Sequence, residues 1–142
     1  MSTYPTPRTV RVTLAAAGLL IAIAAGPGLR AQSKKDFAVS AHRYGYTVQG
    51  STTPEIRVTQ DDLVRITFSS DDIPHSFTLE DETYRIMRRA ELGRPVIFEF
   101  RADKVGRFPF RCTLTIDDRC KEMEGWLIVE AKRQTPRARS PR

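Results

Sequence analysis

The sequence predicts an all-β domain, a sandwich or barrel of seven or eight short strands, over residues 36–131 of the 142-residue chain. Apolar residues in this region alternate with a period of two and show no convincing helical spacing. Residues typical of turns (Gly, Pro, Asp and Ser) separate the alternating runs. A composition with 28% charged and 40% hydrophobic residues excludes wholesale disorder and a polytopic membrane protein.

The expected strands are short alternating runs that follow turn residues. In chain order they cover residues 37–41, 44–48, 56–58, 64–68, 77–79, 96–100, 108–112 and 126–130. The first two runs have opposite parity, which predicts a β-bulge near His42 and Arg43. Residues 83–92 fit either a strand or a single helical turn. Tyr44, Tyr46 and Trp126 are expected to fill the core.

The net charge of +6 is unevenly distributed along the chain. Residues 1–31 contribute +3 and residues 132–142 contribute +5, and neither segment has an acidic residue. The segment between them carries a net charge of −2. A basic nucleic-acid-binding core is therefore excluded, and no nucleic-acid partner is expected.

The two ends are expected to lie outside the folded domain. Residues 1–31 combine Arg8 and Arg11 with an uncharged apolar run over 12–25, and this pattern predicts a signal peptide or signal anchor. Export would place the domain in the periplasm or outside the cell, where disulfides form. Residues 132–142 are expected to be a disordered basic tail. Membrane contact is expected only through an uncleaved N-terminus or this tail.

Four residues with nitrogen or sulfur donors form a candidate metal site: His75, Cys112, Cys120 and Met123. His75 follows a turn, and the other three lie within the loop between two expected neighbouring strands. Thiolate and thioether sulfur are soft ligands, and imidazole also suits copper. Two cysteines in an exported domain can instead form a disulfide, so metal binding and a Cys112–Cys120 disulfide are both open.

These segments resemble the cupredoxin family, in particular the copper domain of cytochrome c oxidase subunit II and nitrous oxide reductase. The loop from Cys112 to Met123 keeps the spacing of that family's Cys-x3-Cys-x3-His-x2-Met motif, and strand 125–130 follows it. Segment 72–77, Asp-Ile-Pro-His-Ser-Phe, is similar to the family's first-histidine segment. Segments 39–46 and 92–94 are similar to its aromatic-Gly-aromatic strand and its Pro-Gly-Arg turn. The resemblance covers residues 37–131 and implies a Greek-key β-sandwich.

Two departures from the family motif change the expected metal site. Ile116 replaces the second bridging cysteine, so no dinuclear copper centre is expected. Cys120 replaces the second histidine. The resemblance therefore implies a mononuclear copper held by His75, Cys112, Cys120 and Met123, with two thiolates that favour Cu(I). His42, the only other histidine, is expected to be a strand residue near the surface.

The resemblance implies electron transfer and not enzymatic activity, because the related domain relays electrons and this sequence shows no catalytic constellation of its own. The implied partner is a c-type cytochrome or another redox protein. Acidic residues in the loop are expected to be solvated, or to steer a basic partner; they are Asp117, Asp118, Glu122 and Glu124. The alternatives are a copper carrier or oxidase-assembly factor with a copper-delivery target, and a metal-free structural domain locked by a disulfide.

Overall fold

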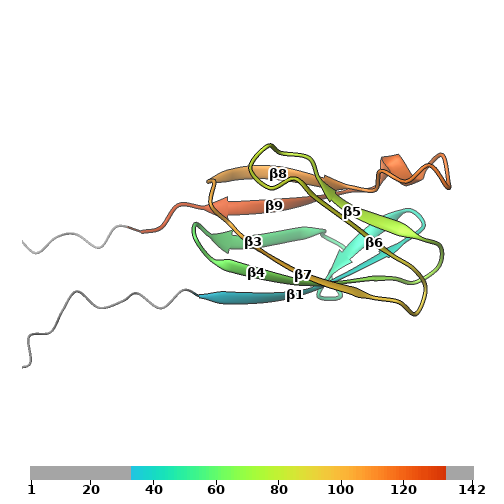
Figure 1. The fold of residues 1–142 in the computed structure, drawn as a ribbon, viewed down its shortest axis with the longest axis horizontal. Coiled ribbons are helices and arrows are strands. Elements are labelled where there is room, and N and C mark those ends of the chain that lie inside the picture. The colour runs from blue at the N-terminus through green and yellow to red at the C-terminus, as the bar shows by residue number, and fades with distance from the viewer. Residues whose placement is uncertain (1–32, 134–142) are drawn as a thin grey trace, which may run out of the picture. The chain divides into compact units, whose positions relative to one another are not determined.

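The computed structural model describes residues 33–133, which form two β-sheets packed face to face (Figure 1). The strands are β1 (Lys34–His42), β2 (Gly45–Val48), β3 (Glu55–Thr59), β4 (Leu63–Ser70), β5 (His75–Leu79), β6 (Ile86–Ala90), β7 (Val96–Arg101), β8 (Gly106–Arg111) and β9 (Glu124–Glu130). A single turn of 3₁₀ helix, η1 (Cys120–Glu122), precedes β9. The predicted β-sandwich is confirmed.

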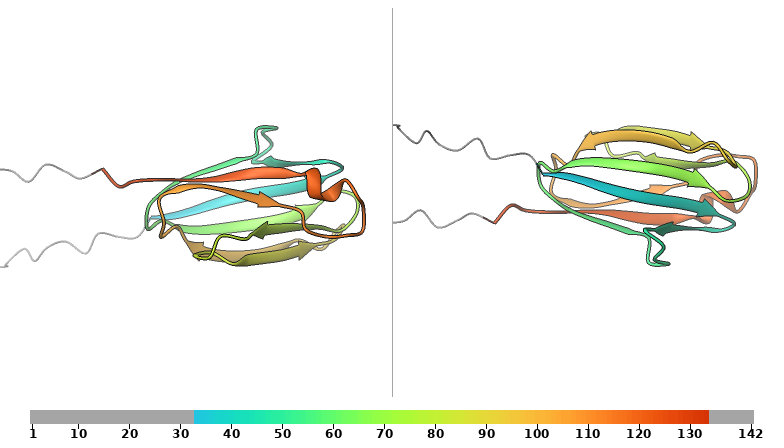
Figure 2. Two further views of the ribbon diagram at one scale, coloured as in Figure 1. Left: turned by 90° about the horizontal axis from the view of Figure 1, so that it is seen from above. Right: turned by 90° about the horizontal axis from the view of Figure 1, so that it is seen from below.

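One sheet has the strand order β2-β1-β4-β7 and the other has the order β3-β9-β8-β5-β6. β1 pairs with β4, and β3 pairs with β9, in parallel, whereas the remaining pairs are antiparallel. The two views in Figure 2 show the sheets as two layers, with η1 at one end of the sandwich. Parallel neighbours come from crossovers between the sheets, so the strand order is that of a sandwich and not of a simple meander.

The core lies between the sheets and consists of the inward-facing residues of the alternating runs. Four phenylalanines form its centre. Phe77 stacks on Phe110 with ring centroids 4.5 Å apart, and its ring lies 5.4 Å from Phe98 and 6.0 Å from Phe68. Because β5 carries both Phe77 and His75, this packing fixes the strand that presents the histidine.

The described residues form nine strands, compared with the seven or eight expected from the sequence. The additional strand is β6, which residues 86–90 form. The sequence left this segment open between a strand and a helical turn. β6 is an edge strand whose three central residues, Met87, Arg88 and Arg89, are all exposed. Its sequence therefore lacks the alternation that identified the other strands. The predicted bulge near His42 is wrong, since residues 43 and 44 form the turn of an antiparallel β1–β2 hairpin.

Two of the three aromatic residues expected in the core lie elsewhere. Tyr46 is buried, but Tyr44 is 36% exposed. Trp126 is half-buried, and the guanidinium of Arg107 lies 4.2 Å from the centroid of its ring. The predicted signal segment 1–31 lies outside the described residues, as does the predicted tail except for its first two residues. Among residues 33–133, no helix is long and apolar enough to cross a membrane.

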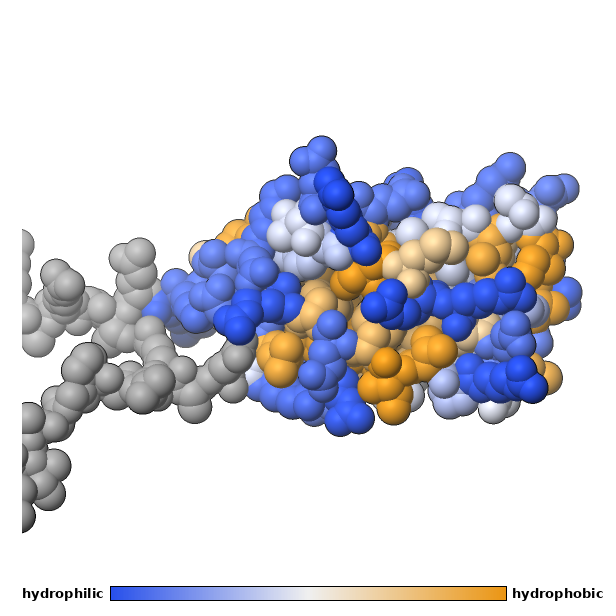
Figure 3. Space-filling model, in the orientation of Figure 1, coloured by the Kyte–Doolittle hydropathy of each residue, from blue (hydrophilic) through white to orange (hydrophobic). Residues whose placement is uncertain are grey.

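Apolar and hydrophilic side chains alternate over the face drawn in Figure 3. Apolar surface appears there in separate patches with hydrophilic residues between them. The large exposed apolar residues come from several parts of the domain, namely Tyr44, Met87, Leu92, Ile97, Val105 and Ile116. Scattered exposed apolar side chains of this kind are normal on a folded domain.

Gly125 allows β9 to pass close to the aromatic core. A Cβ atom at this position would clash with the buried ring of Phe110. Gly125→Ala is therefore expected to lower the free energy of unfolding by about 1–3 kcal/mol, the usual cost of overpacking. Gly45→Ala is a matched control, because its Cβ would meet the His42 ring at an ordinary 3.6 Å. Urea denaturation measures both; equal stability of the two variants would contradict this account of Gly125.

Candidate metal centre

The candidate ligands lie at the end of the sandwich where β5 begins, β8 ends and β9 begins (Figure 1). His75 is the first residue of β5, and Cys112 directly follows β8. Cys120 opens η1, and Met123 lies between η1 and β9. The described chain begins and ends at the opposite end of the sandwich. The loop between two paired strands, β8 and β9, thus carries three of the four predicted ligands.

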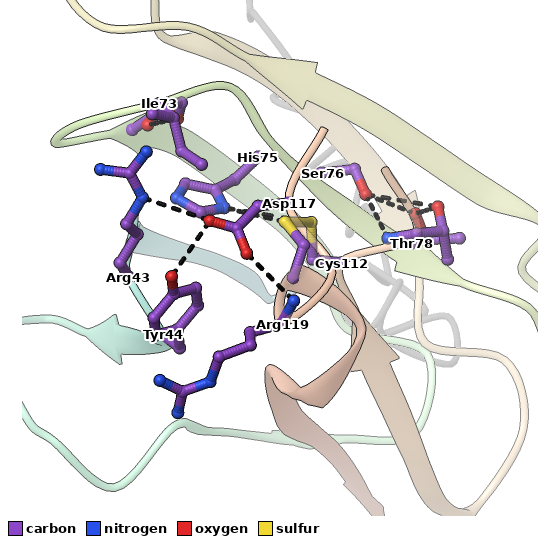
Figure 4. The surroundings of a disulfide bond; sticks show 12 residues. Arg43, Tyr44, Ile73, His75, Ser76, Thr78, Cys112, Asp117 and Arg119 are labelled. Atoms are coloured by element: carbon purple, nitrogen blue, oxygen red, sulfur yellow. Dashed lines mark hydrogen bonds and ion pairs between the residues drawn. A yellow bond between two sulfur atoms is a disulfide. The ribbon is translucent and has the colours of Figure 1, made fainter. Parts of the chain in front are cut away.

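Cys112 and Cys120 are joined by a disulfide, with their Cα atoms 5.5 Å apart (Figure 4). His75 Nδ1 lies 3.3 Å from Cys120 Sγ and 3.9 Å from Cys112 Sγ. One nitrogen and two sulfur atoms thus lie within 4.8 Å of one another, and all three side chains are buried. Met123 is also buried, and its backbone N–H donates to the Cys120 carbonyl oxygen at 3.1 Å.

Asp72 fixes the orientation of the His75 ring. His75 Nε2 lies 2.7 Å from Asp72 Oδ1, and an N–H there donates to the carboxylate while Nδ1 faces the sulfur atoms. The backbone N–H groups of Arg43 and Ile73 donate to the same carboxylate. Burial raises the pKa of Asp72, but these two N–H groups and the His75 ring more than offset that effect and hold the pKa below its usual value.

A network of hydroxyl groups ties the cysteine-bearing end of β8 to β5. These strands share only one paired position, Thr78 with Arg111. Beyond it, the Thr113 N–H donates to Ser76 Oγ at 2.9 Å, and the Thr78 hydroxyl lies 2.9 Å from that of Thr113. Ser76 follows His75 and Thr113 follows Cys112. The network therefore holds the two ligand-bearing segments at a fixed separation.

Tyr46 supports the same strand from the other sheet. Its hydroxyl donates to the Ser76 carbonyl oxygen at 2.6 Å, and burial raises the pKa of this phenol. The tyrosine is buried against Phe110, with ring centroids 5.1 Å apart. The start of β5 is therefore held by the hydrogen bonds of Ser76 with Thr113 and Tyr46, and by the packing of Tyr46 on Phe110.

The structure brings three of the four predicted ligands together. His75, Cys112 and Cys120 form the cluster. Met123 follows η1 directly and is buried, and its role as a ligand stays a prediction. His42 ends β1 and is not part of the cluster. Ile116 is 52% exposed at the loop surface.

Some contacts of the site could not be recognised from a pattern in the sequence. Asp72 stands three residues before His75 in the segment that resembles the family, but that resemblance did not assign it a role. The hydroxyl network joins residues 37 positions apart. Among the loop acids, Asp118 and Glu122 are exposed as expected, whereas Asp117 and Glu124 are half-buried. Asp117 contacts Tyr44 and Arg43, while Glu122 pairs with Arg119 and Glu124 pairs with Arg111.

Comparisons with solved structures identify the fold. The periplasmic domain of cytochrome oxidase subunit II from Bradyrhizobium japonicum matches with a TM-score of 0.59 and 16% identity, over 68% of this chain and 83% of that one. Subunit II of cytochrome c oxidase, in a mixed disulfide intermediate with a thioredoxin-like protein, matches with a TM-score of 0.56 and 18% identity, over 73% and 89%. Auracyanin A, a blue copper protein from Chloroflexus aurantiacus, matches with a TM-score of 0.54 and 16% identity, over 69% and 100%.

A chain of a heme-copper terminal oxidase dimer also matches, with a TM-score of 0.60 and 20% identity, over 70% of this chain and 66% of that one. No protein-family model and no curated protein sequence matches the chain. At these identities the likeness shows the fold alone. The class that fold and topology define is a cupredoxin-like β-sandwich, and the chain has the cupredoxin fold.

Proposed function

We propose that this protein is an exported copper-binding domain that transfers electrons through one copper ion. His75, Cys112, Cys120 and Met123 would hold the ion once the disulfide is reduced. One observation carries the proposal: Nδ1 of His75 faces both cysteine sulfurs, while Nε2 is bound to Asp72. This is the arrangement in which a metal-ligating imidazole is usually held, with one nitrogen at the metal and the other on a carboxylate.

The donor set fits copper better than harder metal ions. Two thiolates, a thioether and an imidazole are soft or borderline ligands, which select copper over calcium or magnesium. The cysteines and His75 are no more than 1% exposed, so the site excludes water. Copper bound there would supply one-electron redox chemistry. The chain's own contribution is a set of donors held in place by β5, β8 and β9.

The proposed role is electron relay, not catalysis, with a redox protein such as a c-type cytochrome as partner. The matches to oxidase subunit II and to a blue copper protein support this role. Another matched cupredoxin-fold chain is a copper nitrite reductase, so the fold by itself does not decide between relay and enzyme. The location we propose is the periplasm or the extracellular space, in line with the predicted signal segment and the periplasmic domain among the matches.

Asp72→Ala tests whether Asp72 orients a metal ligand. We expect the affinity for Cu(I) to fall about 10- to 100-fold, the usual effect of removing the partner of a ligating histidine. Competition with a chromophoric Cu(I) chelator measures the affinity in the reduced protein. Asp118→Ala is the control, since it removes an exposed carboxylate from the nearby loop and is expected to change the affinity less than about twofold. Equal affinities for the two variants would contradict the proposed role of Asp72.

A second candidate is copper carriage or oxidase assembly, and the Cys112–Cys120 disulfide favours it. A cysteine pair that alternates between disulfide and dithiol can be loaded only after reduction, and subunit II of the oxidase forms a mixed disulfide with a thioredoxin-like protein. A reversible one-electron wave in voltammetry with fast exchange to a cytochrome would favour electron transfer. Transfer of Cu(I) to an acceptor without such a wave would favour carriage.

The third candidate is a metal-free domain in which the disulfide has a purely structural role. A count of free thiols in the protein purified without reductant, combined with copper uptake after reduction, separates this candidate from the other two. Two reactive thiols would exclude it. No free thiol, together with no copper uptake after reduction, would favour it.

A further inference from the structure

Asp117 is the main link between the loop of residues 113–119 and the β1–β2 turn. Its Oδ2 accepts a hydrogen bond from the Tyr44 hydroxyl at 3.1 Å and lies 3.4 Å from Arg43 Nε. Its Oδ1 accepts the Arg119 N–H at 3.0 Å, and its backbone oxygen accepts the Cys120 N–H at 3.0 Å. We call this set of contacts around Asp117 the clasp; Figure 4 shows it beside His75 and the disulfide.

The guanidinium of Arg119 completes the clasp. It lies 4.1 Å from the centroid of the Tyr44 ring, so Asp117 and Arg119, two positions apart in the loop, contact the same tyrosine. The hydrogen bonds from Arg119 and Tyr44, together with Arg43, hold the pKa of Asp117 below its usual value, although burial acts in the opposite direction. The carboxylate is therefore ionised at neutral pH, and the clasp is formed under ordinary conditions.

The clasp anchors the segment that connects the two buried sulfurs. Cys112 is 1% exposed and Cys120 is fully buried. Thiol–disulfide exchange requires the attacking thiolate to reach a sulfur atom directly. In this structure both sulfurs are buried, so a reductant reaches them only when the loop moves, and the contacts of Asp117 oppose that movement.

We propose that Asp117 is a positioning residue that sets the rate at which a thiol reductant reaches the Cys112–Cys120 disulfide. A dithiol attacks one sulfur and forms a mixed disulfide, and its second thiol then displaces the cysteine. Two electrons and two protons pass to the cysteines, and the reductant leaves as its own disulfide. The consequence for metal uptake rests on the proposed function, since reduction would precede copper binding.

The test compares the rates at which excess dithiothreitol reduces the disulfide in Asp117→Ala and Asp118→Ala. Both substitutions remove one carboxylate from adjacent loop positions, but Asp118 is exposed and has no role in the clasp. We expect Asp117→Ala to be reduced about 5- to 10-fold faster than the parent, which corresponds to the loss of a charged hydrogen-bonded anchor. Asp118→Ala is expected to stay within about twofold of the parent. Thiol release is followed with a chromogenic reagent.

Two further variants separate loop opening from general destabilisation. Asp117→Asn keeps an oxygen that accepts hydrogen bonds but loses the charge, so its rate should lie between those of the parent and Asp117→Ala. Met87→Ala, at an exposed position of β6, should leave the rate unchanged. Thermal unfolding midpoints of the oxidised proteins are measured alongside, and Asp117→Ala is expected to unfold within a few degrees of the parent.

Equal reduction rates for Asp117→Ala and Asp118→Ala would overturn the proposal. So would a faster rate in Asp117→Ala that global unfolding fully accounts for, as judged from the stability measured in urea. These rates are measured without metal. A failure to bind copper would therefore count against the proposed function and leave the role of Asp117 intact.

Discussion

Replacing Cys120 with serine is expected to lower the affinity for Cu(I) by more than about 100-fold. Removing a hydrogen-bond partner of a ligand costs 10- to 100-fold, and loss of a ligand itself should cost more. Cys120 Sγ is the sulfur nearest to His75 Nδ1, at 3.3 Å. Serine offers a hard oxygen that Cu(I) binds poorly. Chelator competition on the reduced proteins measures the difference.

Thr115→Ser is a suitable control for the cysteine variant. It changes an exposed position of the same loop and leaves the sulfur atoms in place. We expect it to bind Cu(I) as the parent does. Circular dichroism of Cys120→Ser should show that the sandwich is retained, because η1 contributes only one turn to the fold. Parent-like affinity in the folded Cys120→Ser variant would remove Cys120 from the proposed ligand set.

Replacing Phe77 with alanine is expected to lower the free energy of unfolding by about 3–5 kcal/mol. Phe77 is fully buried and contacts three other core phenylalanines, with the Phe110 ring stacked on it at 4.5 Å. Truncation removes these contacts and leaves a cavity between the sheets. Since domains are stable by only about 5–15 kcal/mol, the loss is a large part of the total.

Met87→Ala serves as the control for Phe77→Ala. Met87 lies on neighbouring β6 and is 54% exposed, so its truncation should cost less than about 0.5 kcal/mol. Urea denaturation, followed by the fluorescence of Trp126, gives both values. A stability of Phe77→Ala within about 1 kcal/mol of the parent would contradict the view that the phenylalanine cluster is the centre of the core.

The sandwich could be predicted from the sequence because its strands bury one face. In β4, buried and half-buried residues alternate over the whole strand, and this alternation is present in the sequence. β6 could not be predicted in the same way. It lies at a sheet edge with Met87, Arg88 and Arg89 exposed, so no burial pattern constrains its side chains.

The cluster of His75, Cys112 and Cys120 could be predicted because both cysteines lie in one loop whose spacing resembles a known motif. Cys112, Cys120 and Met123 follow one another closely, and the segment around His75 resembles the matching part of the family. The supporting contacts could not be predicted in this way. Tyr44 and Asp117 are 73 positions apart, and only the packing of the β1–β2 turn against the loop brings them together. Whether the cysteines form a disulfide or bind a metal was open in the sequence, and the structure contains the disulfide.

We propose that the reduced protein holds copper with one histidine, two cysteines and one methionine. The most direct measurement is a copper titration of the fully reduced protein, with metal content, visible absorption and reactive thiols determined on the same samples. We expect one copper per chain, a thiolate-to-copper absorption band in the oxidised complex, and protection of both thiols from alkylation. No bound copper, with both thiols still fully reactive, would contradict it.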